Sequence, residues 1–516
     1  MNSIEIKVNK NTKTVPTDFS WQLGIGNDHA HQVLRKDVCE HLKLAHDEIG
    51  FKYVRFHGIF DDDMLCIQRL TDISSYKNFP MAERISEQNF RRVASVFDNV
   101  LECGLKPFVE LSFMPSALAS GDKTGLAYKN NITMPKDLAA WQKFISDFIG
   151  FLLARYGNDE VESWYFEVWN EPDLDLFFAG SKDDYLKFYE ATAKAIRSVN
   201  KNLRVGGPST SGCRWIEEFT AFCDKNNLPL DFVTTHHYPG DAFGNIVSKE
   251  LIERMMSVAK ECAENGVDMG DAITSIFFNP ENYRTWGKGV FRELDVNARK
   301  EAGGKPLIIT EWNSSATYSV PLHDEKYSSA FVIKSVLDAQ DLTNGYMFWC
   351  CSDIFEETFD LGKPFHGSFG IINNDGIPKP NFWAFKILSE LLPQRYDLPI
   401  TNNDVEYSVF TDGKKLQLLV YAQDFDYQKD EEYSVDIGVQ GAFSNATVQR
   451  IDSDHCNPKK EWIDLGKPDV LTANQATAIK QKTRLKKQDL PIKSVNGETK
   501  ATILLHTNDV ILIEFE

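Results

Sequence analysis

The sequence predicts a (β/α)8 TIM barrel, an α/β fold built on eight parallel strands, followed by a C-terminal β-sandwich domain. Eight short apolar runs alternate with helical patterns between residues 16 and 392, which is the rhythm of parallel strands joined by crossover helices. Acidic and polar residues gather at the carboxyl ends of these runs, where such barrels carry their chemistry. After residue 403 apolar residues recur at every second position, which is typical of half-buried strands.

The expected elements of the barrel follow the chain in order. The eight strands are expected at 21–26, 53–58, 106–112, 165–170, 204–208, 232–238, 306–312 and 345–351. Helical patterns fill the intervals at 86–103, 138–156, 183–199, 214–226, 250–265 and 326–341. Eight strands with intervening helices is the number that closes a barrel, so we predict one catalytic domain over 16–392.

The rest of the chain is expected to form a β-sandwich at 403–516. The turn Asp412-Gly413 separates two alternating runs, and the last strand is expected at 510–515. Residues 1–15 contain the alternating run 4–8, which could add a strand to this domain. The lysine-rich stretch 480–493 is expected to be a solvated connector rather than a binding patch.

Bulk composition excludes several classes of partner. The formal net charge of −19 would repel phosphate, so we expect neither nucleic acid nor an anionic membrane surface as a partner. The first ten residues lack the apolar segment of a signal peptide, and no run of 18 apolar residues occurs. Nine cysteines without C-x-x-C spacing indicate reduced thiols, so a cytoplasmic location is expected.

Two segments, W-Y-F-E-V-W-N-E-P-D at 164–173 and K-P-L-I-I-T-E-W-N at 305–313, each predict a strand that ends in a glutamate. Glu171 and Glu311 would therefore meet at the barrel mouth, and two carboxylates across one bond are the minimum apparatus for glycoside hydrolysis. Taken singly, Glu171 could be an acid in a first helical turn, and Glu311 an ion-pair partner of Arg55. Their joint occurrence on two barrel strands favours catalysis.

The roles of the two glutamates follow from their expected surroundings. Glu311 would be the nucleophile, kept ionised by the guanidinium of Arg55. Glu171 would be the general acid and base, protonated at rest because of burial and the nearby Glu311 charge. Strict strand alternation would turn Asn170 away from the site, and a bulge after Trp169 would let both Asn170 and Glu171 face it. Carboxyl groups about 5–5.5 Å apart would give retention of configuration.

The residues also resemble glycoside hydrolase family 39, the β-xylosidases and α-L-iduronidases. The resemblance begins with E-I-G-F-K-Y-V-R-F-H-G-I-F at 48–60 and continues through F-E-V-W-N-E-P-D at 166–173 and D-F-V-T-T-H-H-Y at 231–238. Further matching segments are L-I-I-T-E-W-N-S-S at 307–315, S-D-I-F-E-E at 352–357 and W-I-D-L-G-K-P at 462–468, the last inside the expected sandwich.

The resemblance implies the same acid/base and nucleophile, and a set of sugar contacts. Asn170 would contact the sugar 2-hydroxyl, and Trp349 would form the aromatic wall of the glycone pocket. The other implied pocket residues are His57, His236, Tyr238, and Glu356 or Glu357 for hydroxyl groups. The resemblance also implies a homo-oligomer, a tetramer. No cofactor or metal is expected, because neighbours such as His236 and His237 on one strand point opposite ways.

The charge of the pocket predicts the sugar. Family iduronidases carry a lysine where this chain has Tyr238, and the loop with Asp353, Glu356 and Glu357 would repel a uronate. A wall of Trp349 and Phe355 would leave little space beyond C5, so a β-xylosidase acting on xylo-oligosaccharides is predicted.

Several alternatives remain open from the sequence. They are a β-glucosidase, an α-L-arabinopyranosidase, an α-L-iduronidase, and a carbohydrate-binding protein without activity. The stretch 240–305 is longer than the family usually carries, and it could be a lid, a subunit contact or a wall of the leaving-group site.

Overall fold

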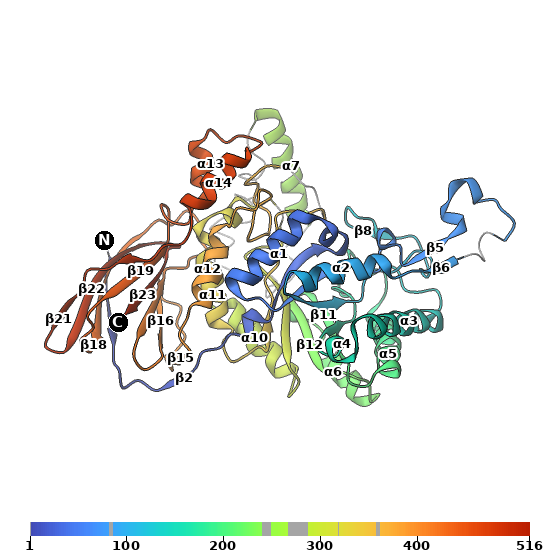
Figure 1. Ribbon diagram of the computed structural model, residues 1–516, viewed down its shortest axis with the longest axis horizontal. Coiled ribbons are helices and arrows are strands. Elements are labelled where there is room, and N and C mark those ends of the chain that lie inside the picture. The colour runs from blue at the N-terminus through green and yellow to red at the C-terminus, as the bar shows by residue number, and fades with distance from the viewer. Residues whose placement is uncertain (1, 82–85, 240–248, 267–286, 318, 358–361) are drawn as a thin grey trace.

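The computed structural model describes residues 2–81, 86–239, 249–266, 287–317, 319–357 and 362–516. A barrel with its surrounding helices makes up most of the molecule, and a β-sandwich that contains both chain ends lies against one side of it (Figure 1). Of the stretch 240–305 noted in the sequence, residues 240–248 and 267–286 lie outside the described residues.

Eight parallel strands form one sheet whose order follows the chain, and the first strand meets the last. An isolated bridge joins Ile25 to Phe348, and the Gly26 amide donates to the Phe348 carbonyl at 2.8 Å. The predicted (β/α)8 barrel is therefore confirmed. Its strands are β3 (Gly24–His29), β4 (Tyr53–His57), β7 (Lys106–Glu110), β10 (Tyr165–Glu167), β11 (Arg204–Thr210), β12 (Phe232–His237), β13 (Leu307–Trp312) and β14 (Gly345–Tyr346).

Several strand and helix bounds differ from the prediction. The first strand begins later and runs to His29, because residues 20–23 form a 3₁₀ turn, η1 (Ser20–Leu23). The fourth strand stops at Glu167, and the eighth keeps two regular residues. The helix expected at 86–103 starts at Arg91, since β6 (Ser86–Gln88) occupies its first residues.

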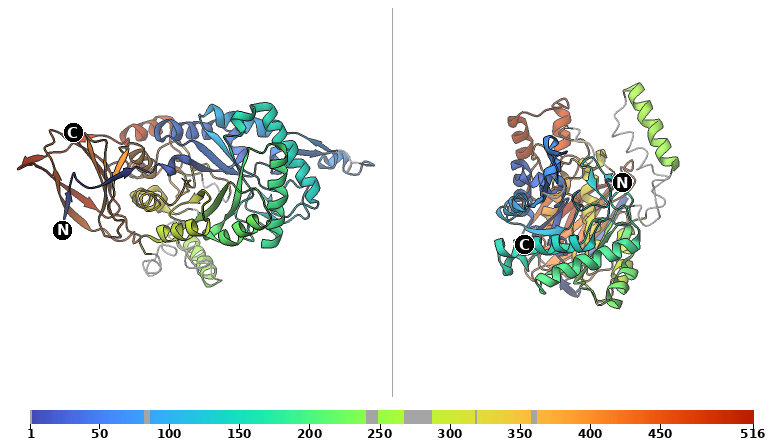
Figure 2. Two further views of the ribbon diagram at one scale, coloured as in Figure 1. Left: turned by 90° about the horizontal axis from the view of Figure 1, so that it is seen from below. Right: turned by 90° about the vertical axis from the view of Figure 1, so that its right-hand side faces the viewer.

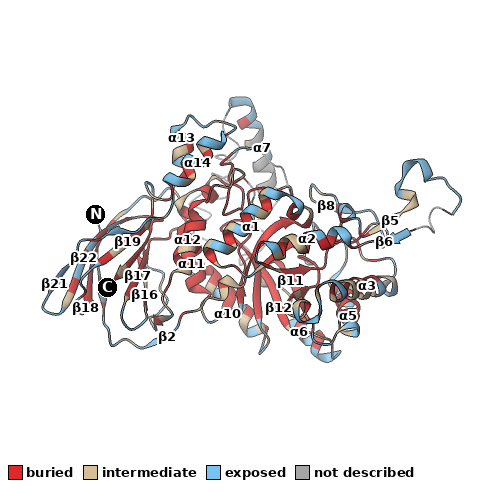
Figure 3. Cartoon of the chain, in the orientation of Figure 1, coloured by how far each residue is buried: buried red, intermediate tan, exposed pale blue. Residues whose placement is uncertain are grey.

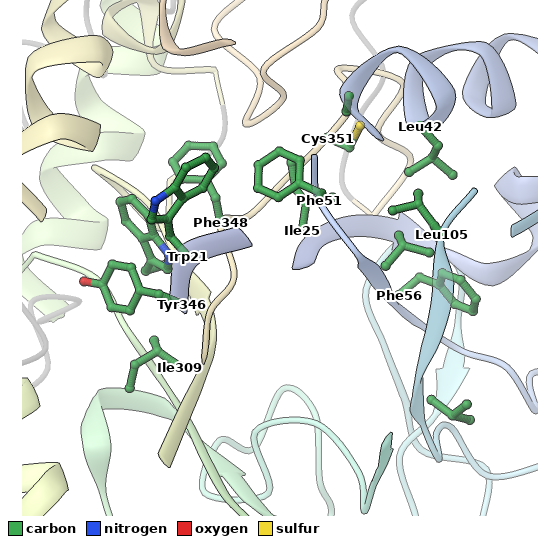
Figure 4. Packing of buried hydrophobic residues seen from close by; sticks show 14 of the residues in the cluster. Trp21, Ile25, Leu42, Phe51, Phe56, Leu105, Ile309, Tyr346, Phe348 and Cys351 are labelled. Atoms are coloured by element: carbon green, nitrogen blue, oxygen red, sulfur yellow. The ribbon is translucent and has the colours of Figure 1, made fainter. Parts of the chain in front are cut away.

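Helices cover the outside of the barrel and bury its apolar face. The helix predicted at 138–156 has those bounds, because Asp137 caps it through the Ala139 amide at 2.8 Å. The covering helices are α1 (Lys36–Ile49), α2 (Arg91–Glu102), α3 (Leu138–Tyr156), α5 (Lys182–Val199), α6 (Ile216–Lys225), α10 (Val290–Glu301), α11 (Lys326–Asp338) and α12 (Pro380–Ser389). By contrast, α7 (Lys249–Asn265) projects from the barrel (Figures 1 and 2). Between helices and strands lies a continuous apolar core that includes Leu42, Phe56, Leu105 and Cys351 (Figure 4).

The sandwich consists of two sheets. One has the order β1-β18-β22-β21, and in it the N-terminal strand β1 (Asn2–Val8) runs parallel to β18 (Glu432–Gln440). The other has the order β2-β15-β16-β17-β23-β19-β20. The remaining strands are β2 (Thr14–Pro16), β15 (Gln394–Tyr396), β16 (Glu406–Thr411), β17 (Leu416–Tyr421), β19 (Ala446–Ile451), β20 (Gln488–Asp489), β21 (Lys493–Val495), β22 (Glu498–His506) and β23 (Val510–Phe515).

Part of the C-terminal region packs on the barrel instead of joining the sandwich sheets. The segment 462–468 was expected inside the sandwich, but α13 (Pro458–Asp464) and α14 (Ala473–Lys482) are helical. Trp462 and Ile479 pack against Phe365 and Ile377 of the loops after β14. The expectation of a connector at 480–493 was wrong at both ends, since it starts in α14 and ends in β21.

The molecule is elongated, with an exposed arm at the end opposite the sandwich. The arm carries β5 (Ile67–Arg69), paired with β6, and it projects beyond the barrel (Figure 2). Its residues are mostly exposed, whereas the barrel strands are buried (Figure 3). All nine cysteines are free thiols. None of the described helices is both long and apolar enough to cross a bilayer.

Candidate active site

Glu171 and Glu311 lie together at the barrel mouth. Glu171 follows β10, Glu311 lies in β13, and one carboxylate oxygen of each is within 4.8 Å of the other. The two residues are 7% and 5% exposed, so both are largely removed from solvent. The spacing fits carboxyl groups that act directly on one bond, about 5–5.5 Å apart, rather than the separation of about 6.5–9.5 Å at which one carboxylate acts through a water molecule.

A break in regular backbone after β10 aims the acidic segment into the mouth. Trp169 and Glu171 have positive φ angles of 73° and 40°, which side-chain-bearing residues rarely adopt. The Glu171 amide donates to the Ser209 carbonyl at 2.8 Å, and the Trp169 indole donates to Phe177 at 2.9 Å. Asn170 and Glu171 therefore both face the site, as the expected bulge required.

Arg55 lies at the centre of the charged side chains in the mouth and has no exposed surface. Its guanidinium lies 2.7 Å from Glu311, 2.6 Å from Glu167 and 2.7 Å from Glu110. It also donates to Asn170 Oδ1 at 2.9 Å. The arginine predicted to support Glu311 thus contacts it, and it also orients the neighbouring amide.

The surroundings of Glu311 favour its ionised form. The Tyr238 hydroxyl donates to Glu311 Oε2 at 2.9 Å, while Oε1 accepts from Arg55. Burial alone would raise the pKa of Glu311, but His236 in its charged form, together with Arg55 and His57, outweighs burial and holds the pKa below its ordinary value. Burial also lowers the pKa of His236 to about 4, so that imidazole is neutral at pH 7. Arg55 is therefore the permanent cation that keeps Glu311 charged.

The surroundings of Glu171 have the opposite effect. Burial, and after it the charges of Glu311 and Asp173, raise the pKa of Glu171 well above its ordinary value. Its Oε1 lies 3.0 Å from His236 Nδ1, and His236 Nε2 lies 3.2 Å from the Ser209 hydroxyl. One carboxyl group of the pair is thus set to hold a proton and the other to lack one.

His57 adds a second positive charge beside Glu311, because its Nε2 lies 3.6 Å from Oε1, the oxygen that Arg55 also contacts. Its Nδ1 lies 2.8 Å from Glu110, and Glu110 raises the pKa of His57 to about 10 against the opposing effect of burial. The ring centroid of Trp349 is 4.7 Å from that of His57, and Phe177 lies at 6.2 Å. These rings form an aromatic side of the mouth, with Trp349 where the sequence placed it.

Of the two glutamates that follow β14, Glu357 is buried and Glu356 is partly exposed. Burial, with Asp28 and Glu311 nearby, raises the pKa of Glu357 to about 8 against the opposing charge of His57. Glu356 instead forms ion pairs with Arg35 at 3.0 Å and His31 at 3.1 Å. Of the two acids left open for hydroxyl binding, Glu357 therefore has the closer electrostatic link to the paired glutamates.

Asp353 was expected among the acids that face the sugar, and this expectation was wrong. Its carboxylate lies 3.0 Å from Lys379 and accepts from the Gly370 amide at 2.8 Å. The aspartate therefore belongs to a separate buried ion pair behind the mouth.

The sequence-based prediction gave no role to several residues of the mouth. Glu110 and Glu167 complete the shell of Arg55. Asp28 accepts from the Tyr128 hydroxyl and from the Glu356 amide. It was passed over because the first strand was expected to end at residue 26, two residues before Asp28. Buried acids at the ends of β3, β7 and β10 were the available signal, since parallel strands bring these ends to one side.

A metal could geometrically fit between the glutamates, since Glu171, His236 and Glu311 each offer an atom within 4.8 Å of the others. These atoms are engaged in the hydrogen bonds described above, and the absence of a metal stays a prediction. His237 Nε2 lies 3.0 Å from Asp295, so it points away from His236 and shares no ligand with it.

Comparison with known proteins gives concordant results. The model of glycosyl hydrolases family 39 matches residues 4–282 and 292–499. A β-xylosidase of Caldicellulosiruptor saccharolyticus is 35% identical over 501 residues, which is 96% of this chain and 94% of its own. A β-xylosidase of Geobacillus stearothermophilus is 30% identical over 509 residues, covering 96% and 92%. The solved structure of a family 39 β-xylosidase from Caulobacter crescentus matches all of both chains, with 28% identity and a TM-score of 0.75.

Proposed function

Because this chain belongs to family 39 of the glycosyl hydrolases, we propose that it is a retaining, exo-acting β-xylosidase that releases xylose from short xylo-oligosaccharides. The observation that carries the proposal is the pair Glu171 and Glu311, whose carboxylate oxygens lie within 4.8 Å and whose pKa values are shifted in opposite directions. Such a pair supplies an acid and a nucleophile at one anomeric carbon.

In the first step the Glu311 carboxylate attacks the anomeric carbon and the bond to the leaving oxygen breaks. Glu171 gives its proton to that oxygen, so the leaving group departs as a neutral alcohol. A covalent glycosyl ester on Glu311 results, and its formation removes the charge that raised the pKa of Glu171.

In the second step Glu171 acts as a base. Its carboxylate, now facing a neutral ester, takes a proton from a water molecule whose oxygen attacks the anomeric carbon. The ester bond breaks, Glu311 regains its charge beside Arg55, and Glu171 regains its proton. Two inversions give a product of retained configuration, and no cofactor or metal is required.

Neighbouring groups supply binding and charge stabilisation. Asn170 Nδ2 is buried without a hydrogen-bond partner, whereas its Oδ1 is fixed by Arg55. We assign this free donor to the sugar 2-hydroxyl, a contact that strengthens in the transition state. His57, His236 and Tyr238 would line the glycone pocket, with Trp349 as its apolar wall, and Glu357 would bind a hydroxyl. Glu356 would act at the rim.

Xylose is favoured because the charges of the mouth suit a neutral sugar better than a uronate, whose carboxylate they would repel. Acids outnumber cations around the paired glutamates, and Tyr238 donates to Glu311. The aromatic rings of Trp349 and Phe355, whose centroids are 6.4 Å apart, limit the space on one side.

Initial rates on four aryl glycosides test the proposal: β-xyloside, β-glucoside, α-L-arabinopyranoside and α-L-iduronide. We expect the highest kcat/KM on the β-xyloside, and the β-anomer of xylose as the first product in a proton NMR time course. Faster turnover of another glycone would contradict the proposed specificity for xylose, and α-xylose as the first product would contradict the retaining mechanism. No turnover of any of the four substrates would contradict the proposed enzymatic activity.

Two finer properties belong to the same proposal. A cytoplasmic location is supported by the nine cysteines, none of which forms a disulfide. A homotetramer is implied by the family resemblance, and sedimentation velocity measures it directly.

A further inference from the structure

A second cluster of histidines and carboxylates lies at the barrel mouth. His29 ends β3, and His31 lies in the following 3₁₀ turn η2 (Ala30–Leu34). Asp61 and Asp63 follow β4, and Glu356 follows β14. The two catalytic steps proposed above use none of the four residues from the first two loops. The cluster therefore needs an explanation of its own.

The Nδ1 atoms of both histidines converge on one point. His29 Nδ1 and His31 Nδ1 are 2.6 Å apart, and His31 Nδ1 lies 3.2 Å from Asp63 Oδ2. One donor atom of each of the three residues lies within 4.8 Å of the other two. The His29 side chain has no exposed surface, whereas those of His31 and Asp63 are 27% and 45% exposed, so the point is open to solvent from one side.

The other nitrogen of each imidazole faces a separate carboxylate. His29 Nε2 lies 2.6 Å from Asp61, and His31 Nε2 lies 3.1 Å from Glu356. A carboxylate that accepts from Nε2–H fixes the tautomer whose Nδ1 carries a lone pair, and it orients the ring. His29 Nδ1 accepts a long hydrogen bond of 3.4 Å from the His31 amide, which a bound cation would replace. Both histidines thus have the carboxylate–imidazole arrangement that supports metal ligands.

We propose that His29 Nδ1, His31 Nδ1 and the Asp63 carboxylate bind one Zn²⁺ ion, with solvent in the remaining position. Two imidazoles and one carboxylate are a donor set that suits zinc and leaves an open fourth place. With Zn–N bonds of about 2.0–2.1 Å, tetrahedral ligands lie about 3.3 Å apart, so the two Nδ1 atoms must separate by about 0.7 Å. Any proton held between the two Nδ1 atoms would be released to solvent when the metal binds.

The competing interpretation is a protonated His31 that donates to both His29 and Asp63. It accounts for the same short contacts without an ion, and Arg35, which pairs with Glu356 at 3.0 Å, already supplies one cation at this edge. The two interpretations differ in what they require. A metal needs both imidazoles in their neutral form and displaces a proton, whereas a protonated His31 repels a cation.

Zinc at this point would join loops that follow three different barrel strands. His29 ends β3, His31 follows it in η2, and Asp63 comes from the loop after β4, while Glu356 from the loop after β14 supports His31. Glu357, the neighbour of Glu356, faces the mouth. Because zinc at this point would bind the folded chain and not the unfolded chain, it should also raise the thermal stability of the protein.

Isothermal titration of the untagged, chelator-treated chain with ZnCl2 tests the proposal. We expect one zinc per chain, release of about one proton when titrations in two buffers of different ionisation enthalpy are compared, and a rise in Tm. His31→Gln and Asp63→Asn should each weaken binding at least tenfold, and Asp61→Asn about 10- to 100-fold as a supporting carboxylate. Co²⁺ titration should give a visible absorption band that His31→Gln lacks.

His506→Gln is the matched control. His506 also lies between two carboxylates, 3.4 Å from Asp430 and 3.6 Å from Glu432, but without a second imidazole. This variant should bind zinc as the parent chain does. Equal zinc binding by the parent chain and His31→Gln, or no binding by either, would each overturn the proposal. His31 is partly exposed, so its variant decides the matter even where Asp61→Asn fails to fold, and a melting curve in EDTA verifies each fold. The test needs no substrate and is independent of the proposed hydrolysis.

Discussion

Two buried charge clusters in the same barrel are built around one cation each. At the mouth, Arg55 pairs with three glutamates at 2.6 to 2.7 Å, among them Glu311. Behind the mouth, Lys379 pairs with Asp324 at 2.7 Å and Asp353 at 3.0 Å, and none of these side chains is exposed. Both clusters place several carboxylates around one central basic side chain out of solvent, and at the mouth His57 adds a second positive charge.

The difference lies in what surrounds the carboxylates. In the Lys379 cluster, backbone amides of Gly367 and Gly370 donate to the two aspartates at 2.8 Å, and Lys379 donates to a backbone carbonyl. At the mouth, Glu311 instead stands beside Glu171, a carboxyl group without a cation of its own and with a raised pKa. A buried ion pair becomes a catalytic site when an uncompensated acid is held next to it and both face a space that a substrate can reach.

Removal of the nucleophile should produce the largest effect of this comparison. Glu311→Gln should lower kcat by at least about 10⁴-fold, because no covalent intermediate can form. The fold should persist, since Arg55 keeps its contacts with Glu110 and Glu167. Steady-state kinetics and urea unfolding on one preparation give both readings. Activity within tenfold of the parent enzyme would contradict the assignment.

Removal of the acid should give a smaller loss that depends on the leaving group. Glu171→Ala should lower kcat/KM about 10²- to 10⁴-fold on xylobiose, whose leaving alcohol needs the proton, and much less on 2,4-dinitrophenyl β-xyloside. Azide should accelerate turnover of the latter and give a β-xylosyl azide, because it attacks the intermediate without base assistance. An equal loss on both substrates would mean that Glu171 is not the acid.

In the Lys379 cluster, removal of the cation should reduce stability and leave activity almost unchanged, which is the opposite of the two preceding variants. Lys379→Met should reduce the free energy of unfolding by about 3–5 kcal/mol, because it leaves Asp324 and Asp353 buried beside each other without a cation. The kcat of the protein that remains folded should stay within about twofold of the parent value. Urea unfolding and kinetics at 20 °C check both statements, and a large fall in kcat without loss of stability would abolish the distinction between the clusters.

The sequence predicted the parts of this comparison that depend on strand positions. Apolar runs located the barrel strands, and the polar ends of two of them located Glu171 and Glu311. It did not predict that Asp353 pairs with Lys379, because the two meet through an irregular loop with no periodic pattern. It also missed the end of β3, since G-I-G-N-D-H has few strand-forming residues and is nonetheless buried throughout.

The smallest expected effect concerns Glu357, whose change of charge tests how the electrostatics of the mouth differ from those of the Lys379 cluster. Its pKa of about 8 means that it carries a proton at pH 6 and loses it as the pH rises past 8, when it becomes an anion near Glu171 and Glu311. Glu357→Gln keeps a neutral donor at every pH, so KM at pH 6 should change by less than about tenfold, the range of one neutral hydrogen bond.

The pH profile separates this residue from the acid. On 2,4-dinitrophenyl β-xyloside, which needs no proton from Glu171, kcat/KM of the parent enzyme should fall as the pH rises through about 8, and Glu357→Gln should lack that fall. Glu357→Leu, which removes the donor, should raise KM at pH 6 more than the glutamine does. If the parent and glutamine profiles coincide up to pH 9.5, Glu357 does not titrate in the site, and the excess of acids there must be balanced by a proton held elsewhere.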